Sequence, residues 1–308
     1  PSLCRKSKVA ALFGHIMRRD PYWIEQFTFA LGLLPEIIRT KPEILYFSDG
    51  SLGNMLWHFR RFFGFGYRLL FSNGGPLSPP FTRWELIQQL APVHLQNASE
   101  SGQSDESQCL VPYGFLPPRC DVPPSRQDIL RIRSVLKLPE NRRIVLAVGA
   151  VNCTHKRMDY VIEELAAIQE NRPYLVLLGQ RDNESNAVES LATSRLGRSD
   201  FTIRTAPANE VQDYLLASDI FVLSSVSEGF PRVVGEAAMS FLPCIVHDYP
   251  LMRYILGSHG HFCDATQNGQ LLKTLRALLN EYPATSVRID AARCARERFS
   301  WGSSDCHR

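Results

Sequence analysis

The sequence has no long apolar run, no clustered cysteines and little net charge, and each absence excludes a class of protein. No stretch approaches the roughly 18 consecutive apolar residues of a membrane helix, and the N-terminal residues lack the order of a signal peptide. Lys plus Arg exceed Asp plus Glu by only 34 − 31 = 3, too few to indicate a nucleic-acid partner. Hydrophobic residues make up 44%, which suffices for a buried core. We therefore expect a cytoplasmic globular protein.

Motifs for metal binding and for hydrolysis are also missing. The eight cysteines form no C-x-x-C pair, and neither Asp-x-Asp nor G-x-S-x-G occurs. The nearest approach to an acidic metal site is Asp182-Asn183-Glu184, which has no third ligand beside it. We predict reduced cysteines, no metal site and no resident cofactor.

From about Arg142 onward, short β-branched runs alternate with amphipathic segments, which is typical of a parallel sheet covered by helices. The predicted strands are Arg143–Val148, Tyr174–Leu178, Phe201–Thr205, Ile220–Ser224, Cys244–Asp248 and His261–Cys263. The predicted helices are Asp159–Glu170, Glu184–Leu196, Glu210–Ala217, Pro231–Phe241, Leu251–Leu256, Gln267–Asn280 and Thr285–Arg298. We expect one complete Rossmann-like domain over residues 126–298.

The preceding part of the chain predicts a smaller α/β domain over residues 1–115. Helices are predicted at Pro21–Thr40 and Leu52–Phe63, and strands at Glu43–Ser48, Tyr67–Ser72, Ile87–Leu90 and Leu110–Val111. Because a dinucleotide-type domain has about six strands, we expect this domain to be truncated. Four prolines within Leu116–Ser125 predict an interdomain linker at residues 116–125.

The segment Ser227–Met239 carries the clearest chemical signal. Glu228 follows a predicted strand, at the end of the sheet where open α/β proteins bind ligands. Pro231 suits the first turn of a helix, and the N–H groups of Gly229 and Phe230 would face an anion bound at the helix start. Within that helix, Glu236 could accept hydrogen bonds from both hydroxyls of a ribose. This pattern predicts a nucleotide phosphate site.

A plainer interpretation of the same helix stays open. Arg232, Glu236 and Ser240 recur every four residues, as on a solvated helix face with one ion pair.

The segment E-G-F-P-x-x-x-G-E-A, from Glu228 to Ala237, resembles the Glu-x7-Glu signature of the retaining GT-B glycosyltransferases of family 4. The surrounding segments resemble that family in the same order; they are Val111–Gly114, Leu146–Gly149, Lys156–Ile162, Leu177–Gly179 and Tyr214–Val222. The resemblance implies two Rossmann-like domains with parallel sheets, and it implies that residues 299–308 begin a helix crossing back to the first domain.

The resemblance also implies roles for individual residues. Glu228 would touch the donor sugar, Glu236 would hold the ribose of the donor nucleotide, and Lys156 would neutralise the donor diphosphate. The residues expected around the donor are Gly149, Arg157, Gly229, Phe230, Pro231, Asn73 and Gly74.

Three positions depart from the family pattern. Arg157 stands where the family usually has glycine, and Ala150 stands where many members have an arginine on the diphosphate. Asn73 stands where many members have a histidine beside the donor sugar, and an amide cannot shuttle a proton as histidine can.

The resemblance implies transfer of a sugar from a nucleotide-diphosphate donor to a carbohydrate, lipid-linked or small-molecule acceptor, with retention of configuration. Two alternatives remain: a non-catalytic nucleotide-binding or scaffold protein of the same fold, and a GT-B phosphorylase or epimerase.

Aromatic and basic residues alternate in the segment Trp57–Phe63. We favour an ordinary amphipathic helix with its arginines facing water. A helix lying on a membrane surface is the alternative, and it would make the protein membrane-peripheral.

Overall fold

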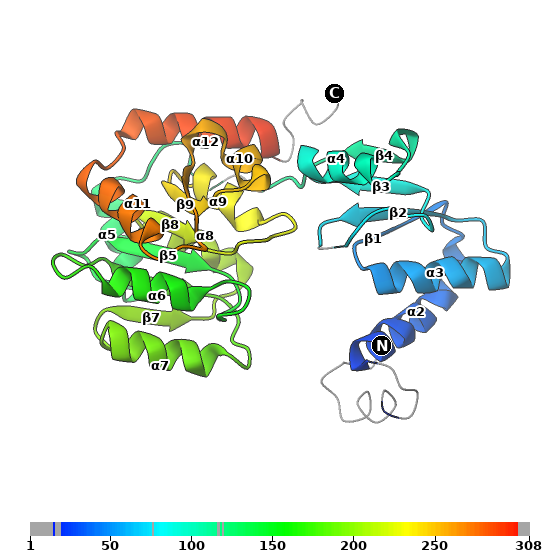
Figure 1. Cartoon of the computed structure of the whole chain (residues 1–308), viewed down its shortest axis with the longest axis horizontal. Coiled ribbons are helices and arrows are strands. Elements are labelled where there is room, and N and C mark those ends of the chain that lie inside the picture. The colour runs from blue at the N-terminus through cyan, green and yellow to red at the C-terminus, as the bar shows by residue number, and fades with distance from the viewer. Residues whose placement is uncertain (1–14, 16–19, 76, 116–117, 119, 301–308) are drawn as a thin grey trace. The chain divides into compact units, whose positions relative to one another are not determined.

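The computed structural model describes residues 15, 20–75, 77–115, 118 and 120–300. The chain divides into two compact units, residues 1–112 and 113–308, and both are shown in Figure 1. Each unit contains one sheet of parallel strands, so the predicted α/β class with two parallel sheets is confirmed.

The second unit holds a six-stranded parallel sheet. In chain order its strands are β5 (Ile144–Val148), β6 (Tyr174–Leu178), β7 (Phe201–Arg204), β8 (Ile220–Leu223), β9 (Cys244–His247) and β10 (His261–Cys263). In space the order is β10-β9-β8-β5-β6-β7. Strand order therefore reverses between β5 and β8, which is the topology of a complete dinucleotide-binding domain. All six predicted strands are present, and no boundary is wrong by more than one residue.

Helices cover both faces of this sheet. They are α5 (Arg126–Leu136), α6 (Met158–Ala166), α7 (Ser185–Arg195), α8 (Ala208–Ala217), α9 (Arg232–Met239), α10 (Pro250–Leu256), α11 (Gln270–Asn280) and α12 (Thr285–Phe299), with a 3₁₀ turn, η2, at Gly257–His259. Helices α6, α7 and α11 share one hydrophobic core with the sheet. Right-handed crossovers place α8 and α9 on the opposite face, since the connections from β7 to β8 and from β8 to β9 run across the sheet in the opposite direction to those from β5 to β7.

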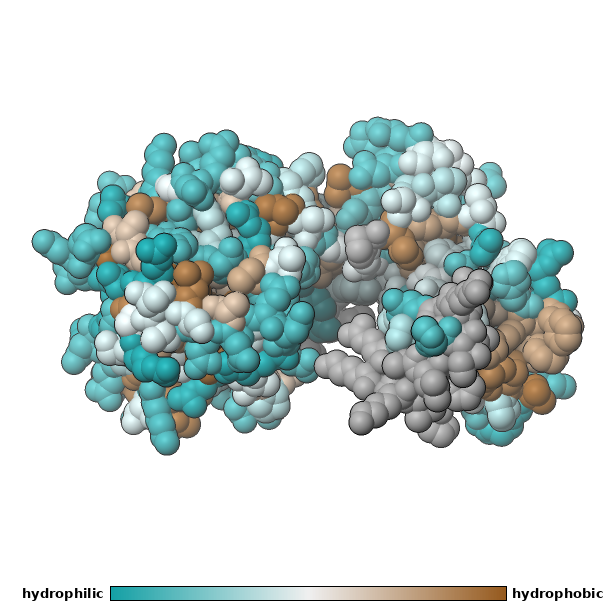
Figure 2. Space-filling model, turned by 60° about the horizontal axis from the view of Figure 1, so that its bottom comes forward, coloured by the Kyte–Doolittle hydropathy of each residue, from teal (hydrophilic) through white to brown (hydrophobic). Residues whose placement is uncertain are grey.

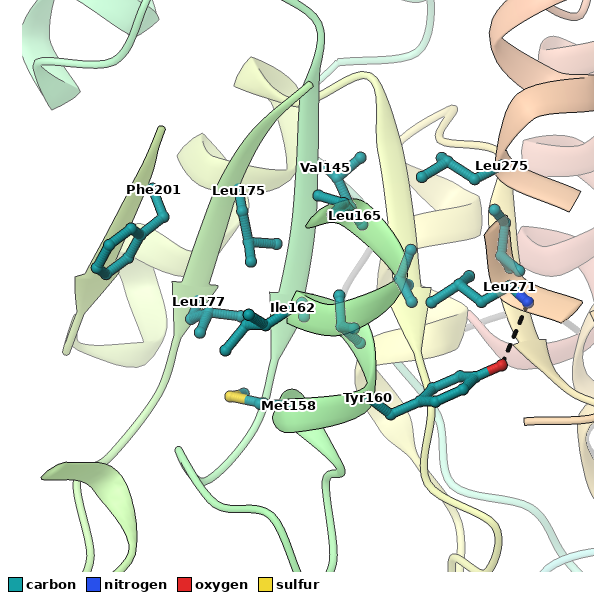
Figure 3. Close-up of a cluster of buried hydrophobic side chains, with 14 of the residues drawn as sticks. Val145, Met158, Tyr160, Ile162, Leu165, Leu175, Leu177, Phe201, Leu271 and Leu275 are labelled. Carbon is teal, nitrogen blue, oxygen red and sulfur yellow. Dashed lines mark hydrogen bonds between the residues drawn. The ribbon is translucent and has the colours of Figure 1, made fainter. Parts of the chain in front are cut away.

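Figure 3 shows how α6 closes this core. Ile162 and Leu165 are fully buried against Val145 of β5 and Leu175 of β6. Tyr160 joins α6 to α11, because its hydroxyl accepts a hydrogen bond from the Leu271 amide (3.2 Å) and donates one to the Gln267 carbonyl (2.8 Å). Burial raises the pKa of Tyr160 to about 12, so this hydroxyl keeps its proton.

The first unit is smaller. In its described part, the strands β1 (Ile44–Phe47), β2 (Arg68–Asn73), β3 (Leu86–Gln89) and β4 (Gln108–Leu110) form a four-stranded parallel sheet in sequential order. The helices described there are α2 (Pro21–Thr40), α3 (Gly50–Phe63) and α4 (Pro92–Glu100), with a 3₁₀ turn, η1, at Asp105–Ser107. The core is unusually aromatic, since Phe47, Phe71, Phe81 and Trp84 lie in mutual ring contact. Among the described helices, none is long and apolar enough to cross a membrane.

Three expectations about segments need correction. Phe115, expected in the first domain, belongs to the second unit, where it pairs with Ser300 and donates a hydrogen bond to the Phe299 carbonyl (2.6 Å). Phe299 is the last residue of α12 rather than the start of another helix, and residues 301–308 lie outside the described part. Helices α4 and α5 were not expected.

Helix α5 is fixed by a buried guanidinium. Arg133 donates hydrogen bonds to the carbonyls of Ala217 (2.8 Å) and Arg142 (2.9 Å), and its Nη2 lies 2.7 Å from a carboxylate oxygen of Asp219. The same carboxylate accepts the Ile144 amide (2.7 Å) at the start of β5. One arginine therefore ties α5, α8 and the amino ends of β5 and β8 together.

Replacing Arg133 with alanine should lower the free energy of unfolding of the second unit by about 3–5 kcal/mol, because Asp219 would be left buried with fewer partners. Denaturant titration measures this. Arg131, on the same helix but 76% exposed, is the matched control, and its alanine variant should change stability by less than about 1 kcal/mol. Equal effects of the two variants would contradict this assignment.

Candidate active site

The predicted site residues of the second unit gather where strand order reverses. Gly149 and Lys156 lie in the loop after β5, and Glu228 and Gly229 lie in the loop after β8. The two strands are neighbours, so both loops emerge from the same edge of the sheet. Parallel sheets of this order bind their ligands at that edge.

Lys156 and Glu228 form the central contact of this site. The ammonium of Lys156 donates to Glu228 Oε1, although the two residues are 72 positions apart. Only 15% of the lysine side chain and 8% of the glutamate side chain are exposed. The other oxygen of this carboxylate, Glu228 Oε2, lies 3.7 Å from His155 Nε2. Burial and the Glu228 charge raise the pKa of the neighbouring Tyr249 hydroxyl above its ordinary value. Together these contacts show a carboxylate surrounded by groups that hold a negative charge in place.

The loop carrying Lys156 is built on Asn152. The side-chain oxygen of Asn152 accepts the Lys156 amide (2.8 Å) and the His155 amide (3.3 Å). At the end of β8, the Ser224 hydroxyl donates to the Lys156 carbonyl (2.9 Å). The backbone on both sides of Lys156 is therefore fixed, and its side chain is aimed by the fold.

The acidic segment Asp182–Glu184 holds the same loop. Glu184 accepts hydrogen bonds from the backbone amides of Cys153 (2.8 Å) and Thr154 (3.0 Å). Asp182 accepts a hydrogen bond from the side-chain amide of Asn152 (2.9 Å). Hydrogen bonding to Thr154 lowers the pKa of Glu184, and hydrogen bonding to Asn152 lowers that of Asp182. In the described residues, no three metal-ligating side chains are close enough to hold an ion. These carboxylates therefore position a loop, a role that their sequence pattern did not indicate.

Gly149 is glycine for two reasons. Its φ of +153° is rarely adopted by residues with side chains, and a Cβ there would lie 2.7 Å from Lys156 Cε. The next strand has a matching requirement, since a Cβ on Gly179 would lie 1.6 Å from the Gly149 carbonyl oxygen. The aliphatic part of the Lys156 side chain therefore packs against Gly149, where a side chain would collide with it.

Three phenylalanines position the Glu228 loop and α9. Phe230 lies 5.9 Å from Phe115 and 6.1 Å from Phe299 between ring centroids, and all three rings are buried. Gly235 of α9 leaves space for Phe115, because a Cβ on Gly235 would lie 2.1 Å from that ring. The Phe230 side chain is therefore part of the core, and only its backbone could contact a ligand.

The helix start after Phe230 is suited to an anion. Helix α9 begins at Arg232, so Pro231 is the N-cap residue and not part of the first turn as expected. In the described part of the chain, the N–H groups of Gly229 and Phe230 have no hydrogen-bond acceptor. Free N–H groups and the helix dipole together attract negative charge.

Glu236 lies on α9, partly buried. Its side chain is 31% exposed, and its carboxylate lies 3.9 Å from the Arg232 guanidinium. Burial raises the pKa of Glu236, an effect that Arg232 opposes. The interpretation of this helix face as a solvated stripe is wrong for Ser240, which is 4% exposed, although the expected ion pair is present.

Arg157 does not join the other predicted donor residues. Its guanidinium donates to the Ala265 carbonyl and lies 4.8 Å from the centroid of the Tyr160 ring, so it is used within the domain. Its φ of +50° is left-handed, which explains why glycine suits this position.

Asn73 and Gly74 belong to the first unit. Asn73 ends β2 and is 6% exposed; its amide nitrogen donates to Gln89 (2.8 Å), and Gln89 in turn donates to Gln108 (2.8 Å). Among the described residues, the Asn73 amide oxygen has no donor. Three amides thus form a buried chain across neighbouring strands, and its first oxygen remains free to accept.

Comparison with solved structures gives the class of fold. The chain resembles sucrose-phosphate synthase from Thermosynechococcus elongatus, with a TM-score of 0.75 at 18% identity over 91% of this chain and 75% of that one. It also resembles Anabaena HepE, solved with UDP and glucose, with a TM-score of 0.74 at 15% identity over 87% of this chain and 78% of that one. The fold is the GT-B architecture expected from the sequence.

Sequence comparison then gives the family. Residues 128–295 match the model of the glycosyl transferases group 1 family, and the chain belongs to that family. It is 30% identical over 141 residues to a Bacillus subtilis (strain 168) protein provisionally named as the teichuronic acid biosynthesis glycosyltransferase TuaC. That match spans 46% of this chain and 34% of the relative, so the chain covers about a third of the relative's length.

Replacing Glu236 with glutamine should change stability and nucleotide binding in opposite directions. Because the pKa of Glu236 is raised in the folded protein, its ionised form destabilises the fold once the pH exceeds 4.5, the ordinary pKa of a glutamate. The variant should therefore have a higher melting temperature than wild type at neutral pH, and an equal one at acid pH. If Glu236 holds a ribose, the same variant should bind nucleotide about ten-fold more weakly.

Scanning calorimetry and titration calorimetry measure the two effects. Glu297→Gln, an exposed glutamate on α12, is the control and should change neither quantity. Unaltered nucleotide affinity in the Glu236 variant would contradict the assignment of this carboxylate to a ribose.

Proposed function

We propose that the protein transfers a sugar from a nucleoside-diphosphate donor to an acceptor hydroxyl, with retention of configuration. The observation that supports this most is the meeting of Lys156, Glu228 and the α9 start at the strand reversal. A buried cation and free N–H groups suit a diphosphate, and a nearby carboxylate suits a sugar. The neighbour HepE was solved with UDP-glucose, which makes a uridine nucleotide the first donor to test.

In the proposed reaction, the bond between the sugar C1 and the diphosphate oxygen breaks, and its electron pair leaves with the diphosphate. The acceptor oxygen bonds to C1 on the same face, and its proton passes to the departing phosphate oxygen. Lys156 and the N–H groups of Gly229 and Phe230 stabilise the charge that develops on the leaving group. Glu228 accepts hydrogen bonds from the sugar.

The acceptor is proposed to bind the first unit. A pocket of about 610 Å³ lies there at the carboxyl ends of β1 and β2. Its lining combines the apolar Phe81 and Trp84 with the polar Asp49, Asn54 and Arg83. Aromatic faces with a few hydrogen-bonding groups are typical of sites for small polar ligands such as sugars.

A turnover assay with nucleotide sugars and a panel of acceptors tests this function. The proposal expects release of nucleoside diphosphate that depends on the acceptor and is lost in Lys156→Met. The product's anomeric configuration, measured by NMR, should equal that of the donor. Nucleotide binding without turnover would instead support the scaffold alternative, and turnover that requires inorganic phosphate would support a phosphorylase.

For the donor to bind, Lys156 should release the Glu228 carboxylate and pair with the donor diphosphate instead. The Lys156 ammonium is paired with Glu228, so a diphosphate must compete with this carboxylate. Glu228→Gln should therefore bind UDP and inorganic pyrophosphate up to about ten-fold more tightly than wild type, while transfer is lost. Titration calorimetry measures both ligands. Glu163→Gln, which removes a carboxylate paired with Arg195 on the surface, is the control. Weaker or unchanged affinity in the Glu228 variant would contradict the exchange.

Donor binding and turnover should also survive removal of divalent metal. The sequence has no Asp-x-Asp motif, and Lys156 with the α9 start can offset the diphosphate charge instead. Activity measured in EDTA should equal activity in magnesium. Activity that EDTA abolishes and that only magnesium or manganese restores would contradict this.

A further inference from the structure

The carboxyl end of α3 exposes large apolar side chains to solvent. Phe62 is 80% exposed and Phe63 is 50% exposed, at the last two positions of the helix. In Figure 2, tan and brown side chains gather at the right edge of the first unit's surface. A contiguous apolar patch on a protein surface often marks an interaction site.

These rings form one continuous surface with their neighbours. Between ring centroids, Phe63 lies 4.9 Å from Phe62, 6.1 Å from Phe59 and 5.5 Å from Phe65. We call these four residues the aromatic tip. Each ring packs against another, so the tip is held in shape before any partner binds and loses little conformational entropy on docking.

Basic side chains lie on the same helix as the aromatic tip and on the strand that follows it. Helix α3 contains no acidic residue. Arg61 lies over the Trp57 ring, with its guanidinium carbon 5.0 Å from the ring centroid, and it has no carboxylate partner among the described residues. His58 and Arg68 are exposed as well. Arg60 differs, since it is 19% exposed and pairs with Glu85 (2.7 Å), which corrects the expectation that both arginines face water.

We propose that the aromatic tip docks on a membrane surface that contains anionic lipid. Phenylalanine rings enter the boundary between headgroups and acyl chains, while arginines beside them contact lipid phosphates. Charge complementarity favours this partner over a second copy of the chain, because two such tips would bring Arg61 and Arg68 against their equivalents. The proposal does not depend on the proposed glycosyl transfer.

Vesicle sedimentation tests the proposal on the full chain. Wild type should bind phosphatidylcholine vesicles that contain phosphatidylglycerol, and bind phosphatidylcholine alone much more weakly. The double variant Phe62→Ser and Phe63→Ser should lose about ten-fold in partitioning, and Arg61→Gln should lose about five-fold on the anionic vesicles only.

Two control variants match the tip in exposure. Val135→Ser removes an apolar side chain that is likewise 80% exposed but lies on α5, and Arg198→Gln removes an exposed arginine in the second unit. Neither should alter vesicle binding. Thermal denaturation of each variant without lipid checks that the fold is intact.

Three results would overturn the proposal. The first is failure of wild type to bind anionic vesicles, and the second is binding of the double variant as tight as that of wild type. The third is loss of lipid-independent self-association in the double variant, which would identify the tip as an interface between copies.

Discussion

The candidate site depends on one constraint, the reversal of strand order between β5 and β8. Within a run of sequential strands, the loop after each strand leads to a helix that covers the next gap. At the reversal, the helices leave on opposite faces, and the loops after β5 and β8 border a common space at the edge of the sheet. Lys156 from one loop and Glu228 from the other meet in that space. There, each of these partly buried groups compensates the charge of the other.

The surrounding structure serves to hold the two loops in place. Asn152 and Glu184 fix the first loop through its backbone amides, and Asp182 holds the side chain of Asn152. The second loop is fixed from below, by Phe230 packed between Phe115 and Phe299. Polar anchors support one side of the site and aromatic packing supports the other, so the backbone of both loops is held in place. Such preorganisation is what charge stabilisation in a transition state requires.

Much of the fold follows from local sequence pattern. The strands of the second unit were predicted almost to the residue because most are short apolar runs that are buried on both faces, as in β6 (Tyr174–Leu178). Helix α5 was missed because its hydrophobic pattern is broken by Arg133, whose burial depends on Ala217 and Asp219 far along the chain. Its start was nevertheless signalled, since Ser125 caps the helix and Asp128 follows three residues later.

The site could be predicted in part. Chain pattern and resemblance pointed to Glu228, Glu236 and Lys156, but only the fold shows that Lys156 contacts Glu228. Arg157 was expected near the donor because it follows Lys156, whereas its left-handed backbone turns the side chain towards Ala265. Neither backbone handedness nor the loop-anchoring role of Glu184 has a signature in residue spacing. Both arise from contacts between segments that are distant in sequence.

Hydrogen–deuterium exchange with and without UDP tests the central claim most directly, because it locates a ligand without any mutation. The account predicts slower amide exchange in the two loops at the strand reversal, residues 149–157 and 227–233, and little change elsewhere in the second unit. Protection at another edge of the sheet, with these two loops unaffected by saturating nucleotide, would contradict it.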